Sequence, residues 1–133
     1  MLPKLLISRL QTLLGADYES VLSAFSLERK GSFRLNLLQW EEKEVLAELS
    51  EKWIQTISFD GLPHVYFFDK KDDYAMKGTD AFYSGKIYLQ SISSTLPALV
   101  LDPKAGESVL DVCAAPGSKT TQMAMLMNDE WSI

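Results

Sequence analysis

The stretch from Ser108 to Ala124 constrains the fold of this chain more than any other part of it. It begins Ser-Val-Leu-Asp-Val, a mixture of apolar and small or polar residues that is typical of a strand. It tightens through Ala-Ala-Pro-Gly-Ser and continues as a helix-compatible run as far as Leu126. The sequence therefore predicts a strand over 108–112, a tight turn, and a helix that starts close to Ser118.

The predicted turn has the residue sizes that a ligand cradle needs. Every second residue after Asp111 is small, namely Cys113, Ala115 and Gly117, so the backbone would be able to approach a bound molecule closely. The helix N-terminus that follows carries free N–H groups and a partial positive charge, which suit a carboxylate or another anion. Asp111, at the end of the strand, would face a cationic or hydroxyl-bearing part of the same ligand.

Two common nucleotide-binding patterns fit this turn poorly. The dinucleotide pattern G-x-G-x-x-G falls on Cys113, Ala115 and Ser118, none of which is glycine. A phosphate loop is disfavoured because Ser118 separates Gly117 from Lys119 and no glycine stands at the upstream position. Spacing alone leaves open a strand-turn-helix packing unit that binds no ligand.

The residues themselves, Asp-Val-Cys-Ala-Ala-Pro-Gly-Ser-Lys-Thr-Thr-Gln-Met-Ala, resemble the S-adenosylmethionine-binding motif of the RNA cytosine-5 methyltransferases. This family includes the bacterial Sun/Fmu ribosomal RNA methylases and the nucleolar NOL1/NOP2/NSUN proteins. The form Gly-Ser-Lys-Thr-Thr-Gln is especially similar to the bacterial branch that methylates 16S ribosomal RNA. The resemblance implies S-adenosylmethionine as cofactor and an RNA substrate, with ribosomal RNA favoured. It implies cofactor contacts from Cys113, Ala114, Ala115, Pro116, Gly117, Ser118 and Lys119.

Two upstream segments extend the resemblance. Arg34-Leu35-Asn36-Leu37-Leu38 is similar to the family's Arg-Val-Asn-Thr-Leu signature. Arg34 and Asn36 would share one face of a strand, where they would hold an RNA phosphate or anchor the small domain to the catalytic one, and we favour the anchor. The segment 85–94 is similar to the family's joint between the N-terminal domain and the methyltransferase fold, although Ser91 stands where an acidic residue is usual.

Hydrophobic periodicity supplies the remaining elements. It predicts two N-terminal helices, within 2–14 and from Asp17 to Phe25, whose leucine stripes form core, and a helix over 41–53 with Trp53 on its apolar face. It predicts strands over 32–38, 53–59 and 64–68 and a charged loop over 69–73. It also predicts a helix through Leu101 that Ser91 or Ser93 caps and that begins close before Pro97. The predicted class is α/β: an α+β domain over 1–85, then the first strand and helix of a Rossmann-like methyltransferase domain over 86–133, which is incomplete.

No catalytic residue is predicted in this chain. In the resembled family one cysteine attacks carbon 6 of the target cytosine and a second helps to release the product. The single cysteine here, Cys113, falls in the cofactor turn, where a small side chain is what packing requires. We therefore expect an RNA cytosine-5 methyltransferase as the full-length protein, and a fragment that is inactive alone.

Two other functions remain open from the residues. One is a catalytically inert RNA- or protein-binding remnant in which the cofactor turn survives as packing. The other is a dinucleotide oxidoreductase, which requires an acidic residue about 20 positions beyond the turn.

Composition excludes several classes of protein. A net charge of −5 argues against a stand-alone nucleic-acid clamp, so any bound RNA must meet local basic residues or another part of the protein. One cysteine and one histidine exclude an internal disulfide and a cysteine-histidine zinc cluster, and no metal is expected. The use of a single cysteine favours a cytoplasmic protein. No run approaches the roughly 20 apolar residues that span a bilayer, so we expect no membrane partner. The sequence does not predict an oligomeric state.

Overall fold

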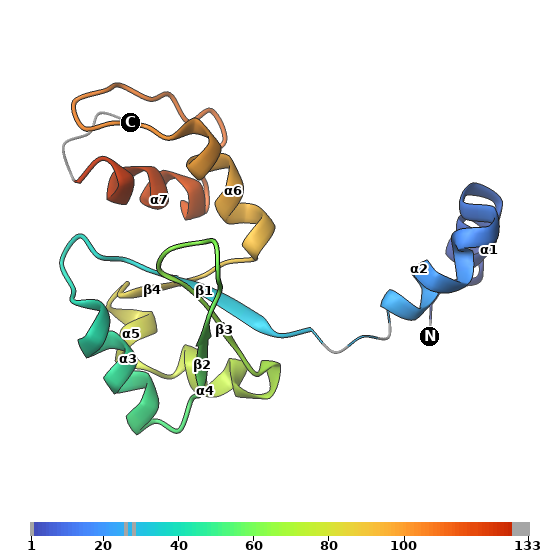
Figure 1. The fold of residues 1–133 in the computed structure, drawn as a ribbon, viewed down its shortest axis with the longest axis horizontal. Coiled ribbons are helices and arrows are strands. Elements are labelled where there is room, and N and C mark those ends of the chain that lie inside the picture. The colour runs from blue at the N-terminus through green and yellow to red at the C-terminus, as the bar shows by residue number, and fades with distance from the viewer. Residues whose placement is uncertain (1, 26, 28, 129–133) are drawn as a thin grey trace.

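A computed structural model describes residues 2–25, 27 and 29–128 of the chain (Figure 1). Its elements, in chain order, are α1 (Lys4–Leu14), η1 (Gly15–Asp17), α2 (Tyr18–Ala24), β1 (Gly31–Leu35), α3 (Glu42–Glu51), β2 (Thr56–Ser58), β3 (Val65–Phe68), η2 (Lys70–Asp72), α4 (Asp73–Lys77), α5 (Asp80–Tyr83), β4 (Ile87–Leu89), α6 (Ile92–Leu101) and α7 (Ser118–Leu126). Helices and a sheet together confirm the predicted α/β class.

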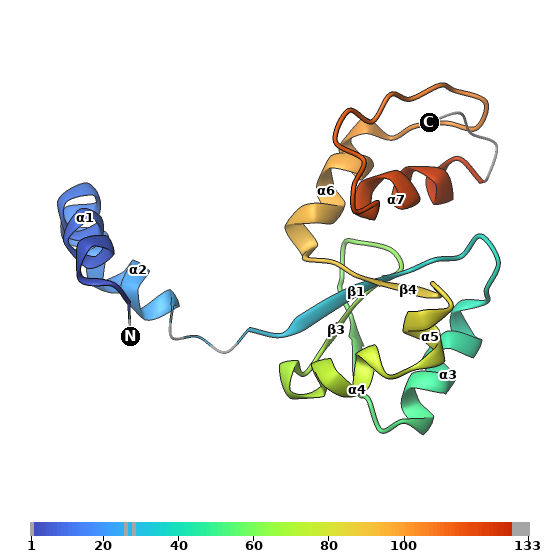
Figure 2. The same ribbon diagram turned by 180° about the vertical axis from the view of Figure 1, so that it is seen from behind.

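The four strands form one antiparallel sheet in the order β2-β3-β1-β4. The central strand β1 alternates between the two faces of the sheet. Phe33 and Leu35 belong to a buried core that includes Val45 and Leu49 of α3, whereas Arg34 contacts α7. Figures 1 and 2 show α3, α4 and α5 on one side of the sheet and α6 and α7 on the other. The α6 and α7 helices therefore cover the Arg34 side of β1, while Ile57 of the edge strand β2 stays 55% exposed.

The helix after the sheet differs from the prediction. Ser91, one of the two predicted caps, does stand at the N-cap position, and α6 begins at Ile92. The expected start close before Pro97 is wrong, because Pro97 lies in the helix interior. A proline there removes one backbone hydrogen bond. Burial of Thr95 and Ala98 on the same helix offsets that loss, so packing overrides the local preference.

The strand predicted over 108–112 is wrong for the described residues, because apart from an isolated bridge at Ser108 this segment forms no sheet. Leu110 is 84% exposed and Val112 is 82% exposed. A strand needs a hydrogen-bonding neighbour and a covered face, and no described segment provides them here. The helix α7 that follows does form, from Ser118 as predicted.

The N-terminal helices form where they were expected, but not as core. Gly15, with φ of 51°, ends α1, and the Asp17 side chain does not cap α2. Leu5 is 64% exposed and Leu13 is 80% exposed, so the expected burial of the leucine stripe is wrong. Figures 1 and 2 show why: residues 2–25 form an arm that stands away from the sheet.

Two smaller differences concern residues 53 and 69–73. The predicted charged loop over 69–73 is helical, as η2 and the start of α4. Trp53 lies beyond the end of α3 and is 90% exposed, so its predicted burial is wrong. The strand β4 follows residue 85 in the chain and pairs with β1. Within the described ranges, no helix is long and apolar enough to cross a membrane.

Candidate cofactor turn

The segment between Leu110 and α7 is organised by Asp111. One carboxylate oxygen accepts the backbone N–H of Cys113 at 3.0 Å, and the other accepts the Thr120 hydroxyl at 2.7 Å. The hydrogen bond from Thr120, the backbone N–H and the charge of Lys119 lower the pKa of Asp111. The carboxylate that was expected to face a ligand is thus engaged inside the turn, where it ties the turn to the first helical residues.

The small residues of the turn lie at the surface. Cys113, Ala114, Ala115 and Pro116 are exposed, and their backbone is not covered by the core of the molecule. Small side chains and an exposed backbone leave room for a ligand to approach the main chain directly.

Gly117 marks the transition from the turn to α7. Its φ of 104° lies in the region that favours glycine, and α7 has no side-chain cap there. The first intrahelical hydrogen bond at this end runs from the Thr121 N–H to the Gly117 carbonyl at 2.9 Å. The amides before Thr121 therefore lack intrahelical partners and are suited to an anionic or carbonyl group. In the first helical turn Ser118 is partly exposed and Lys119 is exposed.

Arg34 joins the sheet to this helix. It is only 1% exposed, and its guanidinium donates to the Thr121 hydroxyl at 3.0 Å and to the Ser118 carbonyl at 3.5 Å. It also donates to the Gln90 side-chain oxygen at 3.4 Å and to the Leu35 carbonyl at 3.2 Å. Burial lowers the pKa of Arg34 to about 10, so the group remains cationic at neutral pH. The anchoring role favoured for Arg34 matches these contacts.

Gln90 and Gln122 extend the anchor across the interior. Gln90 donates to the Ser94 carbonyl at 2.8 Å and to the Gln122 side-chain oxygen at 3.4 Å. Gln122 in turn donates to the Thr95 carbonyl at 3.0 Å and is 2% exposed. Sequence reasoning missed Gln122, although a glutamine on the inner side of an otherwise apolar helix face is a signal of a buried polar contact.

Tyr88 of β4 holds the turn from the side. Its hydroxyl donates to the Pro116 carbonyl at 3.0 Å, and the Arg34 guanidinium lies 5.9 Å from the centre of its ring. Asn36, the second residue of the predicted strand face, donates instead to the Gly85 carbonyl at 3.1 Å. The lone histidine, His64, pairs with Glu42 at 3.0 Å beside β3. The arrangement around the turn can therefore hold and orient a ligand, with no acid-base pair of its own among these contacts.

Comparison with known proteins gives related matches. A family model described as 16S rRNA methyltransferase RsmB/F matches residues 98–133. The chain is 39% identical over 109 residues to the tRNA (cytosine(49)-C(5))-methyltransferase of Pyrococcus abyssi, covering 77% of this chain and 32% of that protein. It is 34% identical over 123 residues to the probable ribosomal RNA small subunit methyltransferase B of a Synechocystis strain, covering 92% of this chain and 27% of that protein.

A solved structure agrees with these sequence matches. The crystal structure of a methyltransferase homologue from Pyrococcus horikoshii has a TM-score of 0.77 to this chain at 30% identity, covering 98% of this chain and 42% of that one. The chain spans about a third or less of the length of the two curated relatives.

Proposed function

Because this chain belongs to the RNA cytosine-5 methyltransferase family, we propose that it is the N-terminal, cofactor-binding portion of an S-adenosylmethionine-dependent enzyme that methylates carbon 5 of cytosine in RNA. Relatives are named for both ribosomal and transfer RNA. The family model that matches the turn and α7 is described as a 16S rRNA methyltransferase, so ribosomal RNA is our first candidate substrate. The corresponding role is the processing of ribosomal RNA. A single cysteine suits a reducing compartment, and we place the enzyme in the cytoplasm.

The observation that carries this proposal is the exposed turn ahead of α7. We assign cofactor contacts to its small residues and first helical turn: Cys113, Ala114, Ala115, Pro116, Gly117, Ser118 and Lys119. The residues fit S-adenosylmethionine because its methionine carboxylate can meet uncapped helix amides, and because Cys113, Ala114, Ala115 and Gly117 have small side chains. The bound cofactor would supply the methyl group.

The chain's own residues contribute position rather than reaction chemistry. Asp111 and Thr120 fix the turn, while Arg34 and Tyr88 hold it against the sheet. Cys113 lies in the turn itself, and we do not assign it as the nucleophile that attacks the cytosine ring. We therefore expect methyl transfer by the full-length enzyme and none by residues 1–133 alone.

Calorimetric titration with S-adenosylmethionine tests the site. Gly117 and Gly61 both have φ of 104°, so valine at either position introduces the same backbone conflict. Gly117→Val is expected to weaken cofactor binding at least tenfold, whereas Gly61→Val, in the hairpin between β2 and β3, leaves it unchanged. A wild-type chain that releases no binding heat, or equal binding by both variants, would overturn the assignment and favour an inert binding remnant.

A further inference from the structure

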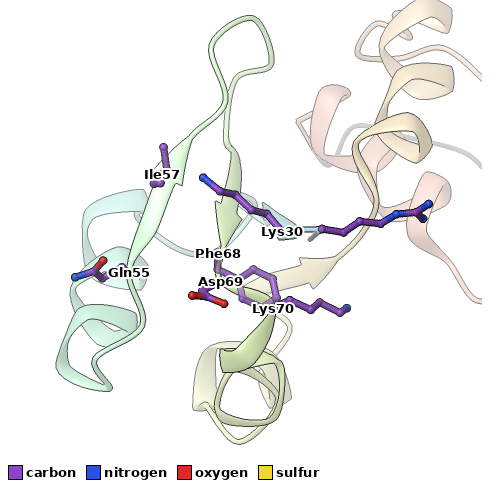
Figure 3. Close-up of a pocket in the computed structure, with 7 residues that line it drawn as sticks. Lys30, Gln55, Ile57, Phe68, Asp69 and Lys70 are labelled. Carbon is purple, nitrogen blue, oxygen red and sulfur yellow. The ribbon is translucent and has the colours of Figure 1, made fainter. Parts of the chain in front are cut away.

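Three hollows on the small domain join into one continuous surface. The first lies between the start of β1 and the end of β3, where Figure 3 shows Lys30, Asp69 and Lys70 grouped around Phe68. The second shares Lys30 and Lys70 with the first and extends to Lys77 of α4. The third shares Lys77 with the second and runs along β4. The three therefore form a path from the edge of the sheet to β4.

The path is positively charged although the chain is acidic. Four cations line its first two hollows, Arg29, Lys30, Lys70 and Lys77, against the two carboxylates of Asp69 and Asp73. The chain as a whole carries a formal charge of −5, so this concentration of cations is local. An acidic molecule repels a polyanion elsewhere on its surface, and such a cluster then determines where the polyanion binds.

The cations are accessible. Arg29 and Lys30 are exposed, and the charge of Lys30 helps to lower the pKa of the nearby Asp69 carboxyl. Lys70 and Lys77 share Asp73, at 3.5 Å and 2.6 Å, and their side chains are 60% and 51% exposed. Exposed pairs of this kind exchange partners readily, because such ion pairs contribute little free energy.

Aromatic residues line the end of the path. Tyr83 is 78% exposed, and its ring meets Phe82 edge-on with centroids 5.7 Å apart. Tyr88, in the same hollow, donates its hydroxyl to the Pro116 carbonyl of the cofactor turn. The path of cations thus ends at the exposed ring of Tyr83 and the half-buried ring of Tyr88, and Tyr88 contacts the proposed methyl-donor site.

We propose that these residues, Arg29, Lys30, Lys70, Lys77, Tyr83 and Tyr88, form an RNA track that guides a single strand toward the cofactor turn. The cations contact successive phosphates and Tyr83 stacks on a base. Single-stranded RNA is the occupant that fits, because exposed aromatic rings can stack only on unpaired bases. The inference rests on the proposed RNA substrate and adds the surface that receives it.

Fluorescence anisotropy with a labelled single-stranded oligouridine measures the phosphate contacts. The triple variant Lys30→Ala, Lys70→Ala, Lys77→Ala is expected to bind about tenfold or more weakly at low salt. Its slope of log affinity against log salt should fall by about 2, at about 0.7 per lost contact. The control triple Lys4→Ala, Lys43→Ala, Lys52→Ala removes equal charge from exposed positions outside the track and should bind like the wild type. Circular dichroism confirms that both variants fold.

Tyr83→Ala separates RNA from a generic polyanion. This variant is expected to lose about tenfold or more in affinity for oligouridine, since stacking on one base is lost. Its affinity for inorganic polyphosphate, which has no bases, should match that of the wild type. Equal losses for both probes would overturn the stacking role.

The outcomes also separate this inference from the proposed function. If both triple variants bind oligouridine alike, or the wild type does not bind it, the track is rejected while calorimetric cofactor binding remains as measured. If the track variants lose affinity for oligouridine but keep their affinity for S-adenosylmethionine, both proposals are supported. Loss of cofactor binding in the lysine triple would overturn the track as a separate surface, because no residue of the turn lines the hollows that these lysines line.

Discussion

At the scale of single residues, Asp111 connects sequence to site. Its two carboxylate oxygens accept from the Cys113 amide and the Thr120 hydroxyl, which spans the whole turn with one side chain. An aspartate with a lowered pKa is held in its charged form by the folded structure. Its contribution is present above the pKa it has in the unfolded chain and is lost as the pH falls through the folded value.

We expect Thr120→Val to raise the pKa of Asp111, because the hydroxyl is the largest contributor to the lowered value. Carbon-detected NMR titration of the Asp111 carboxyl would show a wild-type midpoint below that of an ordinary aspartate and a higher midpoint in the variant. Thr12→Val on the exposed arm, where the hydroxyl donates to the Ser8 carbonyl, serves as the control. Identical midpoints in wild type and Thr120→Val would contradict the assignment.

At the scale of elements, the sheet and α7 are joined through buried polar contacts. Arg34 supplies most of these contacts from β1, and Gln90 and Gln122 continue them toward α6. The acceptors of Arg34 are neutral, so loss of the guanidinium removes its donor from two buried oxygens, the Gln90 side-chain oxygen and the Leu35 carbonyl. Such orphaned groups cost more than the original bonds contributed.

Arg34→Met is therefore expected to lower the free energy of unfolding by about 2 kcal/mol or more. Urea unfolding measures this as a lower midpoint at an unchanged slope. Amide hydrogen exchange should speed up in α7 more than in β1 and β3, because the variant loses the hydrogen bonds that join α7 to the sheet. Arg9→Met on the exposed face of α1 is the matched control, and an equal effect of the two substitutions would contradict the anchoring role.

The elements also show what the sequence could predict. The hairpin of β2 and β3 and the start of α7 were predictable because local signals, Asp60-Gly61 and Pro116-Gly117, specify them. The absence of a strand over 108–112 could not be predicted in this way. A strand forms only beside a neighbouring strand, and the alternating pattern of its residues does not show whether that neighbour is present. Exposed Trp53 was misassigned because the helix ends before it, and helix ends are poorly specified by periodicity.

At the site, the residues of the turn could be predicted from the sequence, but the residues that hold the turn in place could be predicted only in part. The turn from Cys113 to Lys119 was found from its residue types, and whether it binds the cofactor stays a prediction. Gln122 was missed because its role depends on Gln90 and Thr95, which lie 32 and 27 positions away in sequence. Contacts of this separation leave no local pattern.

At the scale of the whole molecule, the arm of residues 2–25 is nearly independent of the sheet. Figures 1 and 2 show it standing apart, and α1 buries none of its residues. An amphipathic helix gains most of its stability by burying its apolar face, and α1 leaves Leu5 and Leu13 exposed. The arm therefore adds little to the stability of the remaining chain.

Deletion of residues 1–28 is expected to change the free energy of unfolding of the remainder by less than about 0.5 kcal/mol, because surface changes away from packed contacts stay within that range. Urea unfolding followed by fluorescence of Trp40, which packs against the core of the sheet, measures it. Deletion of residues 117–133 is the control: it uncovers Arg34 and should lower the midpoint clearly. A comparable loss from the N-terminal deletion would mean that the arm packs on the sheet in solution and that its leucines are core after all.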